Sequence, residues 1–369
     1  MDERDFSIDK SNMIKAIAIM GLLCHHMFGA TFLESHEINQ VYIFPQFTNW
    51  VRSNGQLSIY LFAMVSGYGI AASMKNKTIV KTVWDREIGL LSMFVPVYIL
   101  AFIALIVTEG FSYISNIYSS TDLATRTINV LCDMLGLSGQ YYNKYGFGML
   151  NRTWWYMCAA HYIILTVPFI VMIMKKHNKS GYILWILFGL WLSRFPEQSV
   201  YYSCCFAAIA GACFYEYRIC ERIDSIFNKG FTLRLLEFVL VLGVLVFYFT
   251  FKKYQQMNAY FYMSLFAPVW FIVVESFISR IPFVSNGLAW MGRYGGLFYM
   301  THTLVYSKIS PTRNYIYHFK YAVSSYVAAF VITMGICVMI KLVMKKTGYF
   351  QFVKHLKEKC NPQTNCPVQ

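Results

Sequence analysis

The sequence predicts an all-α, polytopic integral membrane protein with about ten or eleven transmembrane helices. Of its 369 residues, 57% are hydrophobic and only 14% are charged, whereas charged residues make up about 25% of an ordinary soluble domain. Apolar runs recur along the whole chain, and a run of about 20 residues can cross the hydrocarbon core of a bilayer. No long polar stretch separates these runs, so we expect a single membrane domain over residues 1–369.

Ten apolar runs are interpreted as membrane spans. They lie near residues 12–32, 56–74, 88–108, 154–174, 181–195, 200–216, 233–251, 258–279, 288–309 and 321–344. The first run follows the acidic start MDERDFSIDK and has no small-residue cleavage site, so we predict a retained span rather than a signal peptide. The run 128–138 is too short to cross at about 1.5 Å per residue. We expect it to be re-entrant or interfacial.

Basic residues predict the orientation of the chain. If both termini and the short tail 345–369 are cytoplasmic, Lys and Arg in the inner loops outnumber those in the outer loops by about two to one. This bias accounts for the net charge of +14, so no nucleic-acid partner is expected. We predict a multi-pass protein of the cell membrane that has the lipid bilayer as its surroundings.

The ten cysteines do not form a disulfide framework, because most of them lie inside apolar runs, where Cys behaves as a small hydrophobe. The tail pair, Cys360 and Cys366, could form a bridge or bind a metal ion, but no cluster of His or Cys residues lies near it in the sequence. No metal site is therefore predicted.

Histidines are the ionisable residues that lie deepest in the predicted spans. The first span carries His25 and His26, the fourth carries His161 and the ninth carries His302. Their positions place them at a similar depth, roughly 10 Å beneath the outer surface, and Ser66 lies somewhat deeper in the second span. Ionisable groups in a membrane are costly and mark functional sites by default. A simpler alternative is that the rings only hydrogen-bond across helices.

Helical spacing separates the two adjacent histidines. Lys15 and His26 share one face of the predicted first helix, whereas His25 shares a face with Gly21 and Gly29, small residues that are typical of close helix packing. We therefore expect one histidine to face a cavity and the other to face a neighbouring helix. Other catalytic patterns are absent from the sequence: there is no His-x4-Asp, no Gly-x-Ser-x-Gly and no Gly-rich phosphate loop.

Four motifs together resemble acyltransferase family 3, a family of polytopic enzymes that transfer acyl groups to carbohydrates. They occur in the family's order and cover almost the whole chain: KAIAIMGLLCHH (15–26), IYLFAMVSGYGI (59–70), TWWYM (153–157) and MGRYGGLFYMTH (291–302). One departure is visible. Where the family has an Arg-x-Arg pair before a proline, this chain reads WDREIGLLSMFVP, which leaves Arg86 alone between Asp85 and Glu87.

The resemblance implies an O-acyltransferase, most simply an acetyltransferase, with acetyl-CoA or another acyl-CoA as co-substrate and no permanently bound cofactor. The acceptor would be a hydroxyl of an extracytoplasmic or lipid-linked sugar or polysaccharide of the cell envelope. His26 would act as general base or acyl relay, with His302 orienting it or sharing its proton and His25 as the other candidate. The resemblance also supplies binding candidates for the donor and substrate, namely Lys15, Ser66, Tyr68, Arg86, Trp155, Arg293 and Tyr299.

Two alternatives remain at this point. A transporter or flippase for a lipid-linked sugar would suit the prolines inside predicted spans, although no inverted repeat and no intramembrane acid are visible. A membrane-bound O-acyltransferase of the unrelated lipid- and protein-modifying family would also use a buried His, but its partner Asn has no clear counterpart here.

Overall fold

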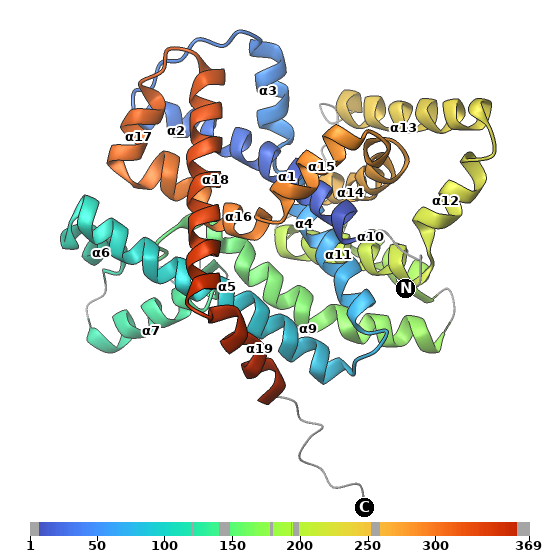
Figure 1. Ribbon diagram of the computed structural model, residues 1–369, viewed down its shortest axis with the longest axis horizontal. Coiled ribbons are helices and arrows are strands. Elements are labelled where there is room, and N and C mark those ends of the chain that lie inside the picture. The colour runs from blue at the N-terminus through green and yellow to red at the C-terminus, as the bar shows by residue number, and fades with distance from the viewer. Residues whose placement is uncertain are drawn as a thin grey trace, which may run out of the picture. The chain divides into compact units, whose positions relative to one another are not determined.

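The computed structural model describes residues 7–119, 122–139, 148–177, 180–192, 194, 199–251 and 259–359. Within these ranges every extended regular element is a helix, which confirms the all-α class (Figure 1). The tail cysteines Cys360 and Cys366 lie outside the described residues.

The helices are numerous and range from single turns to the 31 residues of α5. In chain order they are α1 (Ile8–Met27), α2 (Ala30–Ser35), α3 (Pro45–Asn54), α4 (Leu57–Ser73), α5 (Ile79–Glu109), α6 (Phe111–Ile117), α7 (Leu123–Met134), η1 (Arg152–Trp154), α9 (Trp155–Lys176), α10 (Ser180–Leu192), α11 (Ser199–Glu216), α12 (Ile219–Phe227), α13 (Phe231–Phe251), α14 (Ala259–Ser276), η3 (Ile278–Arg280), α15 (Pro282–Gly292), α16 (Gly295–Thr303), η4 (Leu304–Lys308), α17 (Ser310–Tyr317), α18 (Ala322–Lys346) and α19 (Tyr349–Lys359).

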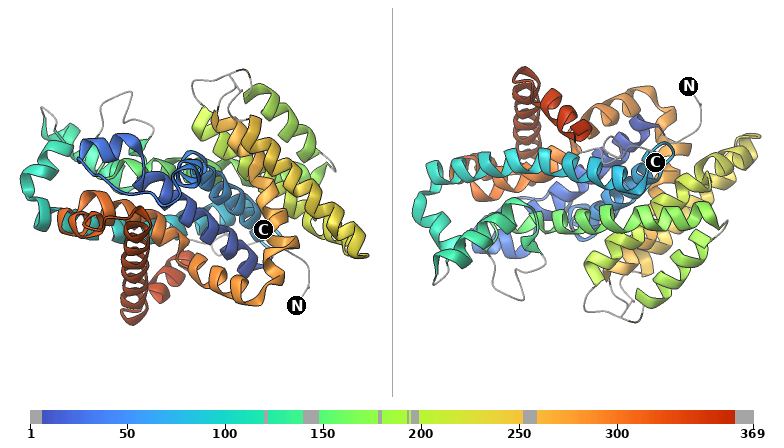
Figure 2. Two further views of the ribbon diagram at one scale, coloured as in Figure 1. Left: turned by 90° about the horizontal axis from the view of Figure 1, so that it is seen from above. Right: turned by 90° about the horizontal axis from the view of Figure 1, so that it is seen from below.

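Five described helical stretches are long and apolar enough to cross a membrane, or six if α3 and α4 are taken as one bent span. The five are Ile79–Glu109, Arg152–Lys176, Phe231–Tyr248, Tyr260–Arg280 and Ala322–Lys346, and α5 can be followed in Figure 2 as one uninterrupted helix. The protein is thus a helical membrane protein. Ten spans and cytoplasmic termini stay predictions.

Two predicted spans are interrupted rather than continuous, and they are the spans that carry His26 and His302. Within 12–32, α1 ends at Met27, and Gly29 is extended before α2 begins. Within 288–309, α15 ends at Gly292 and α16 is followed by a π-helical turn, Leu304–Lys308. Hydropathy averages over such breaks, because it measures apolar content and not the path of the backbone.

The described residues form two compact units. The first comprises Met1–Ala18, Gln56–Thr82 and Tyr162–Arg293, and the second comprises Ile19–Gly55, Val83–His161 and Tyr294–Gln369. Each unit is described separately below.

The centre of the first unit is the contact between α4 and α11. A Cβ atom at Gly67 would overlap the Ala208 carbonyl, and one at Gly211 would overlap the Met64 carbonyl. Glycines at these two positions let the two backbones pack directly on each other, which is the packing that small residues provide in membrane helices.

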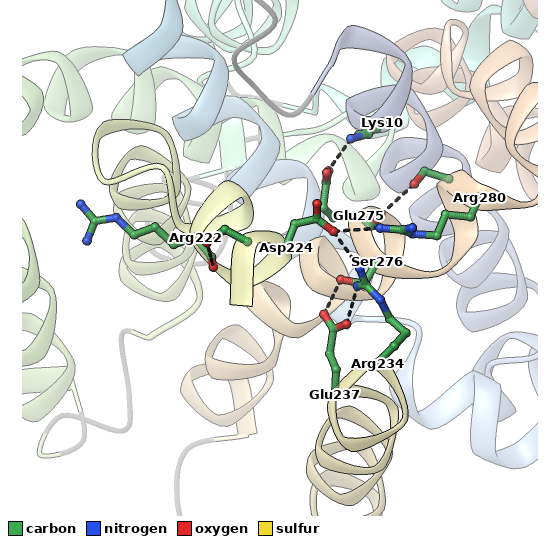
Figure 3. Close-up of polar contacts among 10 residues, drawn as sticks. Lys10, Arg222, Asp224, Arg234, Glu237, Glu275, Ser276 and Arg280 are labelled. Carbon is green, nitrogen blue, oxygen red and sulfur yellow. Dashed lines mark hydrogen bonds and ion pairs between the residues drawn. The ribbon is translucent and has the colours of Figure 1, made fainter. Parts of the chain in front are cut away.

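An ionic cluster also lies in the first unit (Figure 3). Arg234 of α13 pairs with Glu237 at 2.6 Å and with Asp224 of α12 at 3.0 Å, and Arg280 also reaches Asp224 at 2.8 Å. Glu237 is only 2% exposed and also accepts a hydrogen bond from Ser276 of α14. These bonds join α12, α13 and α14, so the acidic residues in this part of the chain have a structural role.

In the second unit, a buried carboxylate holds irregular backbone in place. Asp133 of the amphipathic helix α7 accepts hydrogen bonds from the Tyr118 hydroxyl and, at 2.7 Å, from the Leu150 backbone N–H. Gly136, which follows α7 and its C-cap Leu135 within the run 128–138, has a positive φ of 75°. This segment is therefore a short helix with a turn, and it is not among the described helices long enough to span a membrane.

Candidate functional site

Three imidazole rings gather within the second unit, at the end of α1 and in α16. The ring centroids of His25 and His26 are 5.0 Å apart, and those of His26 and His302 are 5.4 Å apart. The sequence separation between His26 and His302 is large, so only the fold brings these rings together. We call these three residues the histidine cluster.

The ring of His302 has a defined orientation. Its Nδ1 lies 2.8 Å from the Tyr299 carbonyl and 3.2 Å from the Phe298 carbonyl, both one turn earlier in α16. A carbonyl oxygen only accepts, so Nδ1 must carry the proton, and in the neutral ring Nε2 then carries the lone pair. His302 is fully buried, and Nε2 has no hydrogen-bond partner among the described residues. A buried polar atom without a partner is uncommon and needs a physical explanation.

His25 lies at a helix contact. Its Nδ1 donates to the Arg52 carbonyl of α3 at 2.6 Å. A Cβ atom at Gly55 would overlap both the Cβ of His25 and the Gly21 carbonyl, so the chain after α3 packs closely on this face of α1. Of the two adjacent histidines, His26 is the one whose ring lies beside His302.

The segment that leads into α9 holds α16 in position. Trp154 donates from Nε1 to the Met300 carbonyl at 2.8 Å, and the Tyr299 hydroxyl donates to the Thr153 carbonyl. Asn151 donates to the Thr303 hydroxyl at 2.6 Å. These three bonds, which we call the α16 clamp, hold Tyr299, Met300 and Thr303, the residues on either side of His302 in α16.

The sequence predicted Trp155 as a site residue, whereas Trp154 makes the clamp contact. Trp154 is 1% exposed, while Trp155 is half-buried and packs edge-on against Tyr156, with 6.1 Å between ring centroids. The two adjacent tryptophans in the sequence indicated a site residue here, but the sequence could not show which of the two rings faces α16.

The π-helical turn follows His302 directly. Its first three residues are buried, and the ring of Tyr306 lies 6.2 Å from that of His302. Phe298 and Tyr299 also lie 6.2 Å from His302 between centroids, so aromatic rings surround this imidazole. Single π-helical turns are frequent at functional sites because they redirect side chains within a helix.

A series of hydrogen bonds that links Tyr98, Tyr118 and Asp133 lies next to the α16 clamp. The hydroxyls of Tyr98 and Tyr118 are 2.9 Å apart, and Tyr118 bonds Asp133. The Tyr98 ring packs against Trp154, with 5.9 Å between centroids. Burial raises the pKa of Asp133 to about 7, although the hydrogen bonds from Leu150 and Tyr118 oppose this shift.

His161, which the sequence placed at the same depth as the other histidines, makes a different contact. Its Nδ1 lies 2.7 Å from the Glu87 carboxylate and its Nε2 lies 2.9 Å from the Leu135 carbonyl. Both ring nitrogens face acceptors, so the geometry fits an imidazolium paired with Glu87. The ion pair joins α9 to α5, and the hydrogen bond to Leu135 joins α9 to the end of α7.

Two of the predicted donor-binding cations lie in the first unit. Lys15 donates to the side chain of Asn12 at 3.2 Å, and Arg293 lies 3.5 Å from Asp9. A Cβ atom at Gly292 would overlap the Asn12 carbonyl, so α1 and the end of α15 are in close contact here. Lys15 and Arg293 therefore lie on touching elements, whereas Arg86 lies half-buried in α5 of the second unit.

Ser66 and Tyr68 belong to the α4–α11 packing of the first unit. The Ser66 hydroxyl donates to the Phe62 carbonyl of its own helix at 2.9 Å. The ring of Tyr68 packs edge-on against Tyr215 at 5.3 Å between centroids. The SGY motif thus surrounds Gly67, the glycine at which α4 meets α11.

The histidine cluster does not have the arrangement of a metal site. In the described part of the chain, no group of three or more His, Cys, Asp or Glu side chains could hold a metal ion. The cluster instead provides imidazole nitrogens that can donate or accept hydrogen bonds, with aromatic rings around His302.

Comparison with known families identifies the chain. A family model described as an acyltransferase domain matches residues 8–342, which is nearly the whole sequence. The chain belongs to acyltransferase family 3. This confirms the resemblance seen in its four motifs. No curated protein and no solved structure matches the chain. The family 3 protein is therefore a membrane acyltransferase whose domain includes the histidine cluster and the α16 clamp.

Proposed function

We propose that this acyltransferase moves an acyl group, most simply acetyl, from a cytoplasmic acyl-CoA to a hydroxyl of an extracytoplasmic or lipid-linked sugar at the cell membrane. The observation that carries the proposal is the pairing of His26 with His302, in which a buried imidazole nitrogen of defined tautomer lacks a described partner. An imidazole has an ordinary pKa near neutral pH, so it can accept a proton from a hydroxyl and return it within one turnover.

In the proposed reaction His26 takes the proton of the acceptor hydroxyl. The resulting oxygen attacks the thioester carbon, the carbon–sulfur bond breaks, and the CoA sulfur leaves with the proton from the imidazolium. During the reaction the lone pair on Nε2 of His302 would accept a hydrogen bond from the neighbouring ring of His26, and the other nitrogen of His26 would then face the acceptor. His26 could also carry the acyl group transiently, as a relay.

Other predicted residues would act on the donor. Lys15 and Arg293, and separately Arg86, would meet the phosphates of CoA, since guanidinium and ammonium groups bind phosphate oxygens strongly. The Arg293–Asp9 pair is more than half exposed on both sides, 55% and 59%, so a phosphate could replace the carboxylate at little cost. Tyr299, which lies in the same unit as the histidine cluster, would bind the thioester carbonyl only by exchanging the backbone bond that it now makes.

A lipid-linked sugar transporter is the second candidate, because helices broken near a polar site are also typical of transporters. The breaks after His26 and around His302 fit that description. Membership of an acyltransferase family supports group transfer over transport.

The first test measures release of free CoA thiol from acetyl-CoA by protein in proteoliposomes, with a polysaccharide or lipid-linked sugar extract as acceptor. We expect His26→Ala to lower the rate by about 10²- to 10⁴-fold, the usual contribution of a general base. His36→Ala is the matched control, because His36 is exposed, directly follows α2 and lies outside the cluster. Wild-type rates in folded His26→Ala protein would overturn the assignment, and acceptor flux without thiol release would favour the transporter.

A further inference from the structure

A cavity of about 380 Å³ lies next to the histidine cluster within the second unit. Its wall is formed by α1, by α3 with the chain before it, and by the start of α18. The lining is almost entirely apolar and includes Gly21, Cys24, Phe47, Val51, Val323 and Tyr326. We call this cavity the α1–α3–α18 groove.

The outer side of the groove carries the side chains expected at a membrane interface. Phe44 is 69% exposed, Phe47 is 62% exposed and Trp50 is 41% exposed. The rings of Phe47 and Trp50 are stacked, with 5.8 Å between centroids. Exposed aromatic side chains on a short amphipathic helix are typical of the boundary between hydrocarbon and headgroups. The groove is therefore placed to receive a chain from the lipid phase.

A cation lies at the rim of the groove. The guanidinium of Arg52 donates to the carbonyl of Phe28, a lining residue, at 3.1 Å. It is also close enough to the lining residue Tyr42 to oppose the rise that burial causes in the pKa of that phenol. Arg52 is half-buried, and no carboxylate in the described part of the chain forms an ion pair with it. A half-buried guanidinium without a counter-charge favours an anionic ligand with paired oxygens, such as phosphate.

The same residue connects the groove to the histidine cluster. The backbone carbonyl of Arg52 accepts the hydrogen bond from His25, whose ring is 5.0 Å from that of His26. Cys24, which lines the groove, directly precedes both histidines on α1. A phosphate held by Arg52 would thus lie beside the cluster, with its lipid tail in the groove and its sugar near the imidazoles.

We propose that the α1–α3–α18 groove binds the acceptor as a lipid-linked sugar, with the single long tail in the apolar groove and the lipid phosphate on Arg52. This inference rests on the proposed acyl transfer, for which it names the class of acceptor. Charge complementarity at Arg52 and the apolar lining select a lipid phosphate over a neutral lipid and over a free, water-soluble sugar.

The test is a binding assay with a photoactivatable long-chain isoprenyl phosphate, using purified full-length protein in detergent. The neutral isoprenol of the same chain length and inorganic phosphate are the comparison probes. We expect Arg52→Gln to weaken binding of the phosphate lipid by about 10- to 100-fold, the range of a hydrogen bond to a charged group. The same variant should leave binding of the isoprenol unchanged.

Val323→Trp fills the groove from α18 and should weaken both lipids, and Arg126→Gln on α7 is the matched arginine control that should weaken neither. Thermal unfolding of each variant checks that it is folded. If wild-type protein binds the phosphate lipid no better than the isoprenol, or if Val323→Trp has no effect, the proposal is overturned. Competition by inorganic phosphate as strong as by the lipid would show a simple anion site and would also overturn it.

The assay contains no acyl donor, so its result is independent of the chemistry proposed for His26. If the protein binds the lipid but releases no CoA thiol, the groove remains the proposed lipid site and the proposed reaction with acetyl-CoA is wrong. If the protein releases CoA thiol with a free sugar as acceptor and does not bind the lipid, the proposed acyl transfer is supported. The proposal that the groove binds the acceptor is then wrong.

Discussion

The ionic cluster of the first unit and the histidine cluster of the second are two ways of burying ionisable groups in one membrane protein. In the ionic cluster each carboxylate faces a cation: Glu237 faces Arg234, Asp224 faces Arg234 and Arg280, and Glu275 faces Lys10 (Figure 3). In the histidine cluster, Nε2 of His302 faces no described partner. A buried polar atom without a partner costs free energy, and such atoms also occur elsewhere in the described residues, including Oε2 of Glu275. Nε2 of His302 differs from them because a second imidazole, that of His26, lies beside it. We therefore expect substitutions in the ionic cluster to change stability and substitutions in the histidine cluster to change the reaction rate.

The largest expected effect comes from removing the unpartnered nitrogen itself. His302→Asn keeps an N–H donor near the Tyr299 carbonyl but lacks the equivalent of Nε2. We expect the rate of acetyl-CoA-dependent transfer to fall by about 10²- to 10⁴-fold with little change in thermal stability. Initial rates and unfolding curves measure the two quantities. A variant with normal rates and reduced stability would place His302 with the structural groups.

The reverse pattern is expected in the first unit. Glu237→Gln removes the charge that pairs with Arg234 within α13 and that accepts the Ser276 hydrogen bond from α14. Breaking such a pair typically costs about 3–5 kcal/mol, so unfolding should occur at lower temperature or denaturant while the rate per folded molecule stays normal. Glu358→Gln, at an exposed 4.0 Å pair with Lys354, is the control and should change stability little. Lost activity in folded Glu237→Gln protein would contradict the comparison.

Asp133 provides a pH test within the second unit. Its pKa in the folded state is about 7, raised by burial from 3.8. The protonated form is therefore favoured on folding, so stability should be highest below about pH 4 and should decrease as the pH rises to about 7, by up to about 4 kcal/mol at roughly 1.4 kcal/mol per pKa unit. Unfolding curves of Asp133→Asn should lack this decrease.

Asp122 gives a control of opposite sign. Its carboxylate caps α7 by accepting the Thr125 N–H at 2.7 Å, which lowers its pKa. The stabilising contribution of Asp122 is present at higher pH and should be lost as the pH falls through its folded pKa. If Asp122→Asn and Asp133→Asn changed the pH profile in the same direction, the burial of Asp133 would be in doubt.

The smallest effect concerns packing without charge. Gly67→Ala places a Cβ atom on the Ala208 carbonyl at the α4–α11 contact, and overpacking of this kind typically costs about 1–3 kcal/mol. Gly243→Ala in α13 is the matched control, because nothing lies within 4 Å of the added atom, and a helical Gly→Ala change should stabilise by up to about 1 kcal/mol. Equal melting temperatures for the two variants would show that α4 and α11 do not pack as described.

Local features of the sequence were sufficient to predict the membrane class, the all-α fold and the family. Hydrophobic runs and low charge are properties of short windows, and the four motifs are each read within a dozen residues. The same local reading identified His26 and His302 as candidates and separated the faces of His25 and His26 by helical spacing.

Tertiary structure decided which candidates meet. The contact between Trp154 and Met300 joins residues 146 positions apart, and the sequence could not choose it over Trp155. The ion pair of His161 with Glu87 spans 74 positions and separates that histidine from the cluster. The breaks after Met27 and at Leu304–Lys308 are also visible only in the structure, since hydropathy reports how apolar a segment is and not where its backbone turns. Amino-acid composition was sufficient to predict that a segment lies in the membrane, whereas packing between distant segments determines which side chains are in contact.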